Sequence, residues 1–540
     1  MSALSSPVPT STAAALNWTR AQAAFFAMHL MTWVAAGAQL LIDSSYDNLI
    51  CVVFVLFSST LTFVYIRNTR SLREVPLSTM AVLGLCVTTQ WGALVGQSAL
   101  WGSLTEHLRV PLQTFGYLAG FQVVAVAAHW VSRRFKGFMT ARQVGAAVLA
   151  PLGIFRVPSV SAMWTMGLIG LGANVVGKVL ELGLLGKIAD GFAPLCWAPF
   201  VIPLLAARYG SVYCNARRQW FGVAAFTVAL MVMGMALNAR AFMLAGVMTA
   251  LLLFGVSVLD DDRPLALRSL RFVLLVLVAG AVLFQPLGYF FTAMQVARVE
   301  RGKLSRLEMI KHTFAVLQDP SAVRRESNRM VTDADIGAYD EYYFSSSMVG
   351  RLVETKFHDN GFYMVQDVRP AESRLIAEDL VDRVVSVLPY PVLKAMGMER
   401  SKYATLYSAG DLLVHVRLGG EMGQFRTGSM FAQGLAIFGV WTPFLYFLFC
   451  LPIFIAWDIL SKAGRNGALA LTSVVGLLLM YRLFAYGIVT ESISNVAGLL
   501  LRFHLQTILL YALVFGMTRL VWKPFDPAAP ALQGQRVHAP

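Results

Sequence analysis

The chain has 540 residues, of which 57% are hydrophobic and only 14% charged, and its mean hydropathy is +0.62. These values exclude a soluble or disordered chain and are typical of a polytopic membrane protein. The net charge of +14 does not indicate nucleic-acid binding, because the Arg and Lys residues cluster in short linkers between apolar blocks. Cytoplasmic loops of membrane proteins carry such clusters. We therefore expect an all-α polytopic membrane protein whose surroundings are a lipid bilayer, with no nucleic-acid partner.

Residues 1–20 are rich in Ser, Thr, Ala and Pro, without a basic start and cleavable apolar core, and predict a short cytoplasmic tail. Apolar blocks of about 20 residues, long enough to cross roughly 30 Å of hydrocarbon, then recur through residues 21–294. Nine spans are predicted at residues 21–42, 49–66, 75–99, 110–131, 160–177, 188–207, 221–237, 241–259 and 272–294. Residues 141–156 are apolar but carry Arg142 and Arg156, and we interpret them as an interfacial segment.

Residues 295–429 form the one long interval without an apolar block, and they predict a loop domain outside the membrane. Three further spans are predicted at residues 430–455, 468–488 and 493–520, within a second membrane domain of residues 430–520. Residues 521–540 predict a Pro/Ala-rich cytoplasmic tail. The expected total is about twelve transmembrane helices.

The linkers that follow even-numbered spans carry the Arg and Lys clusters, and those that follow odd-numbered spans are poor in them. The exception is the linker after the fifth span, where Lys178 and Lys187 flank Glu181. Because short cytoplasmic loops hold the excess of Lys and Arg, we expect both termini in the cytoplasm and the long loop on the opposite side of the membrane.

No metal or cofactor is expected. The five cysteines show no CxxC or Cys/His spacing, and the chain lacks GxSxG, Walker A and HExxH motifs. Asp333-Ala-Asp335 imitates the Asp-x-Asp metal motif of nucleotide-sugar transferases. Nucleotide sugars are cytoplasmic, however, and this loop is expected outside.

Cationic residues gather at the predicted outer ends of the spans. Arg240 sits at a tight turn between two apolar blocks, and Arg482, Glu491 and Arg502 lie at the outer ends of the last two spans. An arginine at the edge of the membrane is costly unless it forms an ion pair or binds a ligand. The planar guanidinium fork suits phosphate groups. Snorkelling of Arg240 to the headgroups, and internal pairs of Glu491 with either arginine, are the structural alternatives.

Within the loop, Arg351, Glu354 and His358 are spaced i, i+3 and i+7, so on one helix they would share a face. Lys356 and Asp359 lie among them. This face would offer a cation for phosphate and a candidate base; a solvated helix with local ion pairs is the alternative.

Asp411-Leu-Leu-Val-His-Val-Arg417 alternates like a short strand, and a glycine-rich stretch with Glu421 follows it. Arg426 then leads into the tenth span, and glycines beside charges would let the backbone approach a ligand closely. An ordinary loop is the alternative.

The layout resembles that of the Wzy-type polysaccharide polymerases and the related O-antigen ligases. The residues that carry the resemblance are 235–246, which correspond to the family's Gly-Ser-Arg-Gly segment, 346–359, and 428–439 with its Gly-Ser start and Phe-Gly end. It covers roughly residues 221–520. Ligases have a histidine just before the re-entering span, where this chain has Phe425-Arg-Thr-Gly-Ser, and this favours the polymerase. Asn238-Ala-Arg240 also departs from the family's Gly-Ser-Arg.

The resemblance implies a GT-C-like membrane glycosyltransferase that polymerises undecaprenyl-pyrophosphate-linked oligosaccharide repeats on the periplasmic side of a bacterial inner membrane. Donor and acceptor would both be such lipids, with a chain-length regulator and a flippase as candidate protein partners. The expected phosphate-binding residues are Arg240, Arg351, Arg426, Arg417 and Arg502.

The general base would be His358 or Glu421. Tyr342, with Tyr339 and Tyr343, would stack on sugar rings or belong to the loop core. A ligase-type transferase and a lipid-linked glycan transporter or flippase stay open as alternatives. The loop's position after the ninth span and the few ionisable residues at mid-membrane depth weigh against transport.

Overall fold

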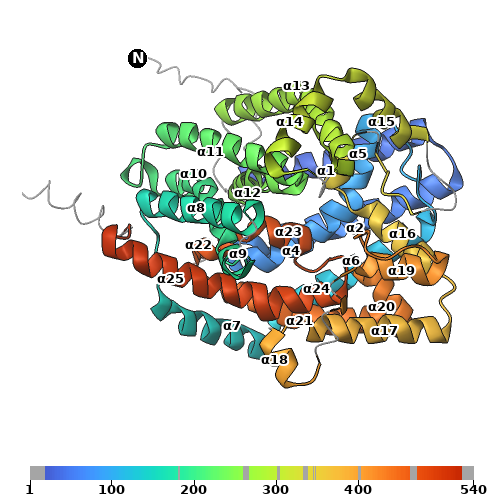
Figure 1. Cartoon of the computed structure of the whole chain (residues 1–540). Helices are drawn as coiled ribbons and strands as arrows, with labels where there is room; N and C mark the ends of the chain where they lie inside the picture. Colours follow the sequence, from blue (N-terminus) through green and yellow to red (C-terminus); the bar gives the residue numbers. More distant parts are fainter. Residues whose placement is uncertain are drawn as a thin grey trace, which may run out of the picture.

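The computed structural model describes residues 19–180, 183–259, 267–300, 304–332, 339–344, 346, 348–388, 390–398, 403–404, 406–462 and 471–525. Within these ranges the chain is almost entirely helical, and ten helical segments are long and apolar enough to cross a membrane (Figure 1). An all-α polytopic membrane protein is thereby confirmed, while the division into domains and the total of twelve spans stay predictions.

The ten candidate spans are built from α1 (Arg20–Ile42), α2 (Tyr46–Thr69), α4 (Pro76–Cys86) with η1 (Val87–Trp91) and α5 (Gly92–Leu100), α6 (Pro111–Arg134), α8 (Val160–Asn174) with η3 (Val175–Val179), η4 (Ala193–Trp197) with α10 (Ala198–Tyr209), α11 (Ala216–Leu237), α12 (Arg240–Leu259), α20 (Met430–Phe438) with α21 (Thr442–Asp458), and α24 (Ile493–Gly498) with η11 (Leu499–His504) and α25 (Leu505–Val521). Three of these segments, η1, η3 and η11, are π-helical turns.

The other elements are α3 (Ser71–Glu74), α7 (Lys136–Leu149), α9 (Gly183–Asp190), α13 (Leu267–Ala297), α14 (Arg306–Leu317), α15 (Pro320–Thr332), η7 (Val349–Arg351), α16 (Thr355–Val365), α17 (Pro370–Val385), α18 (Tyr390–Ala395), α19 (Ala409–Leu418), α22 (Val474–Leu478), α23 (Met480–Tyr486) and an antiparallel pair of two-residue strands, β1 (Ser461–Lys462) and β2 (Leu471–Thr472), with short 3-10 turns between some of them.

The eleventh predicted span is wrong as a continuous helix. Ser473 caps α22, whose first turn begins at Val474, and the axis breaks at Leu479 before α23 begins. Every residue of α22 is buried, so this segment packs inside the helical body and does not face lipid. The ninth predicted span corresponds to α13, a helix of 31 residues with Pro286 inside it.

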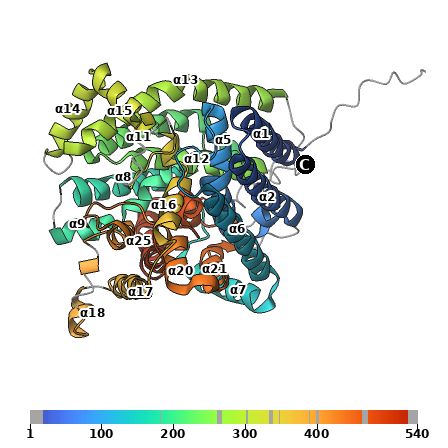
Figure 2. The same ribbon diagram turned by 90° about the vertical axis from the view of Figure 1, so that its right-hand side faces the viewer.

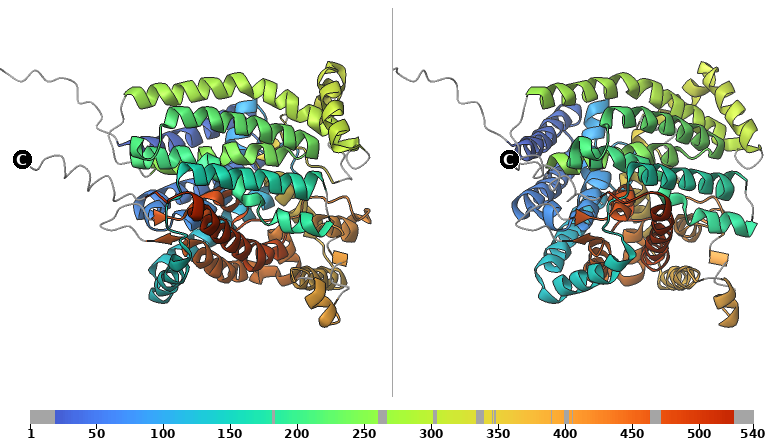
Figure 3. Two further views of the ribbon diagram at one scale, coloured as in Figure 1. Left: turned by 60° about the vertical axis from the view of Figure 1, so that its left-hand side comes forward. Right: turned by 90° about the vertical axis from the view of Figure 1, so that its left-hand side faces the viewer.

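The segment at residues 141–156 forms most of α7, which is too short to span and mostly exposed. It lies at one end of the helical body, and the helices of residues 304–418 lie at the other (Figure 3). At the α7 end, the linkers after the fourth, tenth and twelfth predicted spans meet: Arg142 lies 3.7 Å from Asp458, and Val157 forms a β-bridge with Phe525. These three linkers, which the charge rule assigns to one side of the membrane, thus lie together, and the assignment of sides stays a prediction.

The loop between α13 and α20 is not a detached domain. α16 lies within the body beside α6 and α20, and nine of its eleven residues are buried (Figure 2). α16 approaches α20 closely at Gly361, where a Cβ atom would lie 2.7 Å from Cβ of Ser429. The strand predicted at residues 411–417 is wrong: this segment belongs to α19, because Ser408 and Asp411 form a capping box that starts a helix.

α23 is fixed against α4 through Gly84. A Cβ atom at this position would lie 1.8 Å from the backbone oxygen of Phe484. We expect Gly84→Ala to separate the two helices and lower the thermal unfolding midpoint in detergent, since overpacking typically costs about 1–3 kcal/mol. The matched control is Gly120→Ala in α6, where a Cβ would meet nothing within 4 Å. Equal midpoints for the two variants would contradict this packing.

Candidate functional site

Two neighbouring cavities lie near the end of the body that carries the loop helices. The smaller, which we name the acidic chamber, has a volume of about 70 Å³ and is lined by Arg351, Glu354, His358, Tyr486 and Glu491, together with Phe357, Thr427, Gly428 and Thr490. The larger, which we name the cationic cavity, measures about 920 Å³. Tyr486, Thr490 and Glu491 line both, so the two spaces adjoin.

A π-helical turn in the third span holds the acidic chamber in place. The backbone N–H of Glu354 donates to the Thr88 carbonyl at 2.7 Å, and the Thr355 hydroxyl donates to the Thr89 carbonyl at 2.7 Å. Both carbonyls belong to η1, and π-helical turns leave backbone groups free for such contacts and occur often at functional sites. Glu354 is therefore positioned from the membrane body.

Glu354 faces the acidic chamber without a partner. Its carboxylate makes no hydrogen bond or ion pair with the described residues. Burial raises the pKa of Glu354 to about 8, and the nearby Glu491 carboxylate adds to the increase. Burial and the charge of Glu341 likewise raise the pKa of Glu491, while Arg351 opposes them. A carboxyl whose pKa lies near the working pH is suited to proton transfer.

His358 lines the same chamber from the first turn of α16. Its Nδ1 lies 2.8 Å from Oγ of Ser429, and its Nε2 has no hydrogen-bond partner within the described structure although the side chain is 2% exposed. Burial lowers the pKa of His358 to about 3, so the ring is neutral at pH 7. A buried ring nitrogen without a partner is costly unless a ligand completes it.

Four cationic side chains line the cationic cavity: Lys178, Arg383, Arg482 and Arg502. Arg383 is held by Asp379 at 2.6 Å, and Lys178 donates to Asn174 at 2.8 Å. For Arg482 and Arg502, the described part of the chain supplies no ion-pair partner. The internal pairs of Glu491 with these arginines, which the sequence leaves open, are not formed there.

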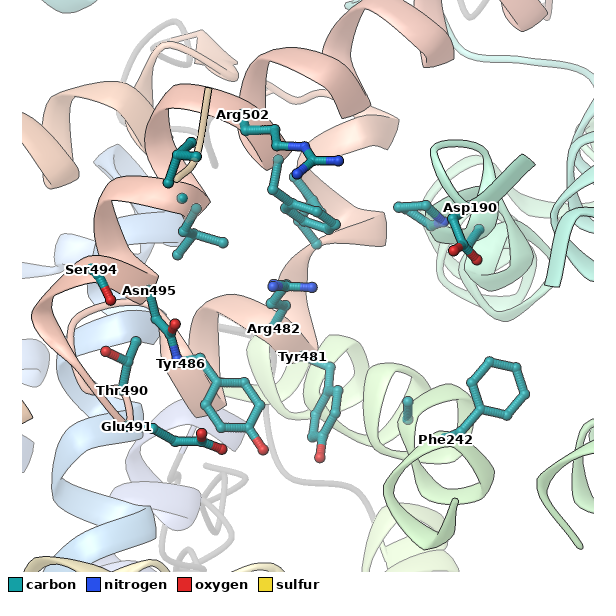
Figure 4. Close-up of a pocket in the computed structure, with 18 of the residues that line it drawn as sticks. Asp190, Phe242, Tyr481, Arg482, Tyr486, Thr490, Glu491, Ser494, Asn495 and Arg502 are labelled. Carbon is teal, nitrogen blue, oxygen red and sulfur yellow. The ribbon is translucent and has the colours of Figure 1, made fainter. Parts of the chain in front are cut away.

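Figure 4 shows the guanidinium groups of Arg482 and Arg502 pointing into one space, with Asp190 across it and Glu491 on the side of the acidic chamber. Arg482 also stacks on Phe503, with Cζ 3.8 Å from the ring centroid. Such stacking fixes a guanidinium plane without neutralising its charge. Two guanidinium forks that share a cavity can bind a ligand with two phosphate groups.

The other two π-helical turns border this cavity. Lys178 lies in η3, and Arg502 lies in η11. Of the three π-helical turns in the described ranges, η3 and η11 thus contribute side chains to the cationic cavity, and η1 anchors the acidic chamber. Part of the cavity wall comes from the linkers after the fifth, ninth and eleventh predicted spans, through Lys178, Arg383 and Glu491, and the rest comes from the adjoining span ends. The charge rule assigns these three linkers to the same side of the membrane.

Of the predicted phosphate-binding residues, Arg502 lines the cationic cavity and Arg351 lines the acidic chamber, where it lies 3.7 Å from Glu341. Arg417 pairs at 2.7 Å with Asp367, outside both cavities. Arg426 lies 3.4 Å from the buried Asp411 and donates to the Glu421 carbonyl, so its role in the structure is to close a loop.

Glu421, the alternative base, is exposed and lines neither cavity. The predicted shared helix face is wrong, because Arg351 lies in η7 and α16 begins only at Thr355. The fold still brings Arg351, Glu354 and His358 together. Lys356 and Asp359 do not join them: Lys356 pairs with Asp340 at 3.2 Å, and the Asp359 carboxylate accepts backbone N–H groups of Arg109 and Val110.

Tyr339 and Tyr342 pack within the loop, whereas Tyr343 joins the loop to the linker after the third predicted span. The hydroxyl of Tyr339 donates to Thr427 O at 2.7 Å, that of Tyr343 donates to Leu104 O at 2.7 Å, and that of Tyr342 lies 3.4 Å from a carboxylate oxygen of Glu326. None of them lines the cationic cavity or the acidic chamber. These contacts agree with the loop-core alternative.

Arg240 begins α12, after Asn238 adopts a left-handed conformation that ends α11. The Arg240 side chain lies outside the described part, but Phe242 and Ala245 from the same helix line the cationic cavity. Asp333 and Asp335 lie outside the described residues as well.

Lys178 was not identified from the sequence as a member of the site. Glu354 was named in a cluster of charged residues but was not identified as the candidate base. A signal for Lys178 was present: its linker is the exception to the charge rule, as expected for a lysine that faces a cavity.

Comparison with protein-family models, with curated proteins and with solved structures finds no match to this chain.

Proposed function

We propose that the protein is a membrane-embedded glycosyltransferase that polymerises lipid-diphosphate-linked oligosaccharide repeats, as the resemblance to Wzy-type polymerases implies. The observation that carries the proposal is the juxtaposition of the cationic cavity, with the unpaired Arg482 and Arg502, and the acidic chamber, with the unpaired Glu354. A volume of about 920 Å³ lies within the range of ligand pockets, which extends to about 1,000 Å³. The proposed setting is the extracytoplasmic side of a bacterial inner membrane.

The cationic cavity would hold the diphosphate of the donor. As the bond between the anomeric carbon and the phosphate oxygen breaks, negative charge grows on the leaving diphosphate. Arg482, whose guanidinium is oriented by Phe503, and Arg502 offset this charge. Lys178 adds a third positive charge to the same cavity. The leaving group is a diphosphate and needs no proton, so the reaction requires a base and no acid.

The acidic chamber would receive the acceptor hydroxyl. Glu354 takes the hydroxyl proton as the acceptor oxygen forms its bond to the anomeric carbon, and His358 Nε2 makes a hydrogen bond that orients the acceptor. With a pKa of about 8, Glu354 is ionised in only about a tenth of molecules at pH 7, but its ionised form is a stronger base than a carboxylate of ordinary pKa. We assign the proton to Glu354 because this half-buried side chain lines the acidic chamber, whereas Glu421 is exposed and lines neither cavity.

The test of the proposed function is deletion of the gene in its host, with surface and lipid-linked glycans separated on a gel. Loss of the high-mass ladder, with single repeats still attached to the acceptor lipid, is the expected result. Full-length polymer that accumulates without attachment would instead indicate a ligase, which uses the same donor. Repeats trapped on the cytoplasmic face would indicate a flippase, and an unchanged glycan profile would contradict all three.

A further inference from the structure

α17 lies across the ends of two membrane spans, and its contacts give its depth. The Ser373 hydroxyl, near its start, donates to the Ala436 carbonyl at 2.7 Å. Val387, just past its end, packs on Gly498: its Cγ2 is 3.8 Å from the position of a Cβ on that glycine. Ala436 is six residues into the span Met430–Asp458, and Gly498 is five residues into the span Ile493–Val521. The span Met430–Asp458 is interrupted at Gly439, so the depth is taken from Gly498: at 1.5 Å per residue, this contact lies roughly 8 Å inside the helix end.

That depth corresponds to the membrane interface. The span Ile493–Val521 has 29 residues in unbroken helical turns and is therefore about 44 Å long. This length equals the full bilayer thickness with headgroups, of which roughly 30 Å is hydrocarbon. The contact at Gly498, about 8 Å from the helix end, therefore falls close to the boundary between headgroups and hydrocarbon, where interfacial helices lie.

The segment that follows α17 has the composition of an interfacial segment. Between Leu388 and Met398 only Lys394 is charged. Tyr390 is 53% exposed and Met396 54%, and Val392, Leu388 and Met398 are also exposed. Only Leu393 of α18 is buried. Exposed apolar residues gathered in one segment mark a contact surface, and tyrosine and lysine are enriched at membrane interfaces.

Lipid fits this surface better than a second protein. α18 projects sideways from the body at the end of the long helices, beyond the neighbouring α17 (Figures 2 and 3). The adjacent last span exposes a stripe that begins just after Gly498 and runs through Leu501, Leu505 and Leu509. Lipid that covers this stripe reaches the depth of Gly498, where Val387 packs. α18 begins three residues after Val387 and therefore starts close to that lipid.

We propose that α17 and the segment Leu388–Met398 form an interfacial unit that is embedded in the bilayer leaflet at the cavity end, with Tyr390, Val392 and Met396 in contact with lipid. Because Arg383, Ser386 and Val387 of the same unit line the cationic cavity, one wall of that cavity is anchored in the leaflet. The inference rests on depth, composition and exposure, and it holds whether or not the proposed function is correct.

Nitroxide accessibility tests the proposal on the full chain in phosphatidylcholine/phosphatidylglycerol nanodiscs. A spin label is placed at Met396→Cys in a Cys214→Ser background, since Cys214 is the one native cysteine that is not buried. Collision rates with lipid-soluble oxygen and with the water-soluble nickel chelate NiEDDA are then compared. Leu505→Cys in the last span is the lipid reference, and Arg324→Cys in the polar helix α15 is the water reference.

The oxygen-to-nickel ratio at Met396→Cys is expected to exceed that at Arg324→Cys several-fold and to approach that at Leu505→Cys. A ratio equal to that of the water reference would overturn the proposal. Spectral broadening by a second label, in discs that hold two copies, would also overturn it and would assign the surface to a second copy of this chain. Val392→Cys replaces Met396→Cys if that variant does not fold.

Discussion

Replacing Arg482 with alanine is expected to lower the rate of polymer formation by about 10²–10³-fold, the loss typical when one preoriented charge-stabilising group is removed from a transition state. The protein should remain folded, because Arg482 has no ion-pair partner in the described structure and its removal leaves no buried carboxylate alone. The measurement is polymer formed per unit time in reconstituted membranes supplied with the lipid-linked repeat. Arg417→Ala is the matched control, since Arg417 pairs with Asp367 outside both cavities.

A double substitution tests whether Arg482 and Arg502 bind one group. If both forks hold the same diphosphate, the loss in Arg482→Ala/Arg502→Ala should be smaller than the product of the two single losses, because residues that share a partner are not additive. Arg482→Lys should recover only part of the activity, since lysine keeps the charge but not the planar fork. Equal activity of Arg482→Ala and Arg417→Ala would remove the cationic cavity from the reaction.

The helical membrane body could be predicted because its signals are local. Each span is a block of apolar residues of the required length, and capping residues such as Ser408 act within one helical turn. The eleventh span failed for a physical reason: its described residues 473–488 are apolar because most of them are buried in protein. Arg482, toward the outer end of this block, was the indication that one face lines a cavity, since an arginine facing lipid there would be costly.

The candidate site could be predicted only in part, because pairing depends on the tertiary fold. The sequence gives no reason to distinguish Arg351 from Arg426 and Arg417. In the structure, Asp411 holds Arg426 and Asp367 holds Arg417 outside both cavities. Hydropathy also gives no sign of π-helical turns, which depend on one extra residue per turn within an otherwise regular helix. The placement of Glu354 by η1 was therefore beyond sequence reasoning.

Glu354→Gln should lower polymer formation by about 10²–10⁴-fold, the usual contribution of a general base, and should change its pH dependence. In the wild type, the ionised carboxylate is the active form. Because the pKa of Glu354 is raised to about 8, activity should increase as pH rises through that value. Glutamine cannot ionise, so the residual activity of the variant should lack this increase. Glu421→Gln, at an exposed position outside both cavities, is the control and should retain the wild-type profile.

The same substitution has an effect on stability that does not depend on catalysis. The folded protein keeps the Glu354 proton up to about pH 8, whereas an unfolded chain loses it near the ordinary glutamate pKa. Between these values the folded state binds more protons, so the unfolding free energy of the wild type should fall as pH rises. The Glu354→Gln variant should lose less stability over that interval when thermal unfolding is followed in detergent. If the two proteins respond alike to pH, Glu354 is not buried and protonated as described, and the base must be sought elsewhere in the acidic chamber, first at His358.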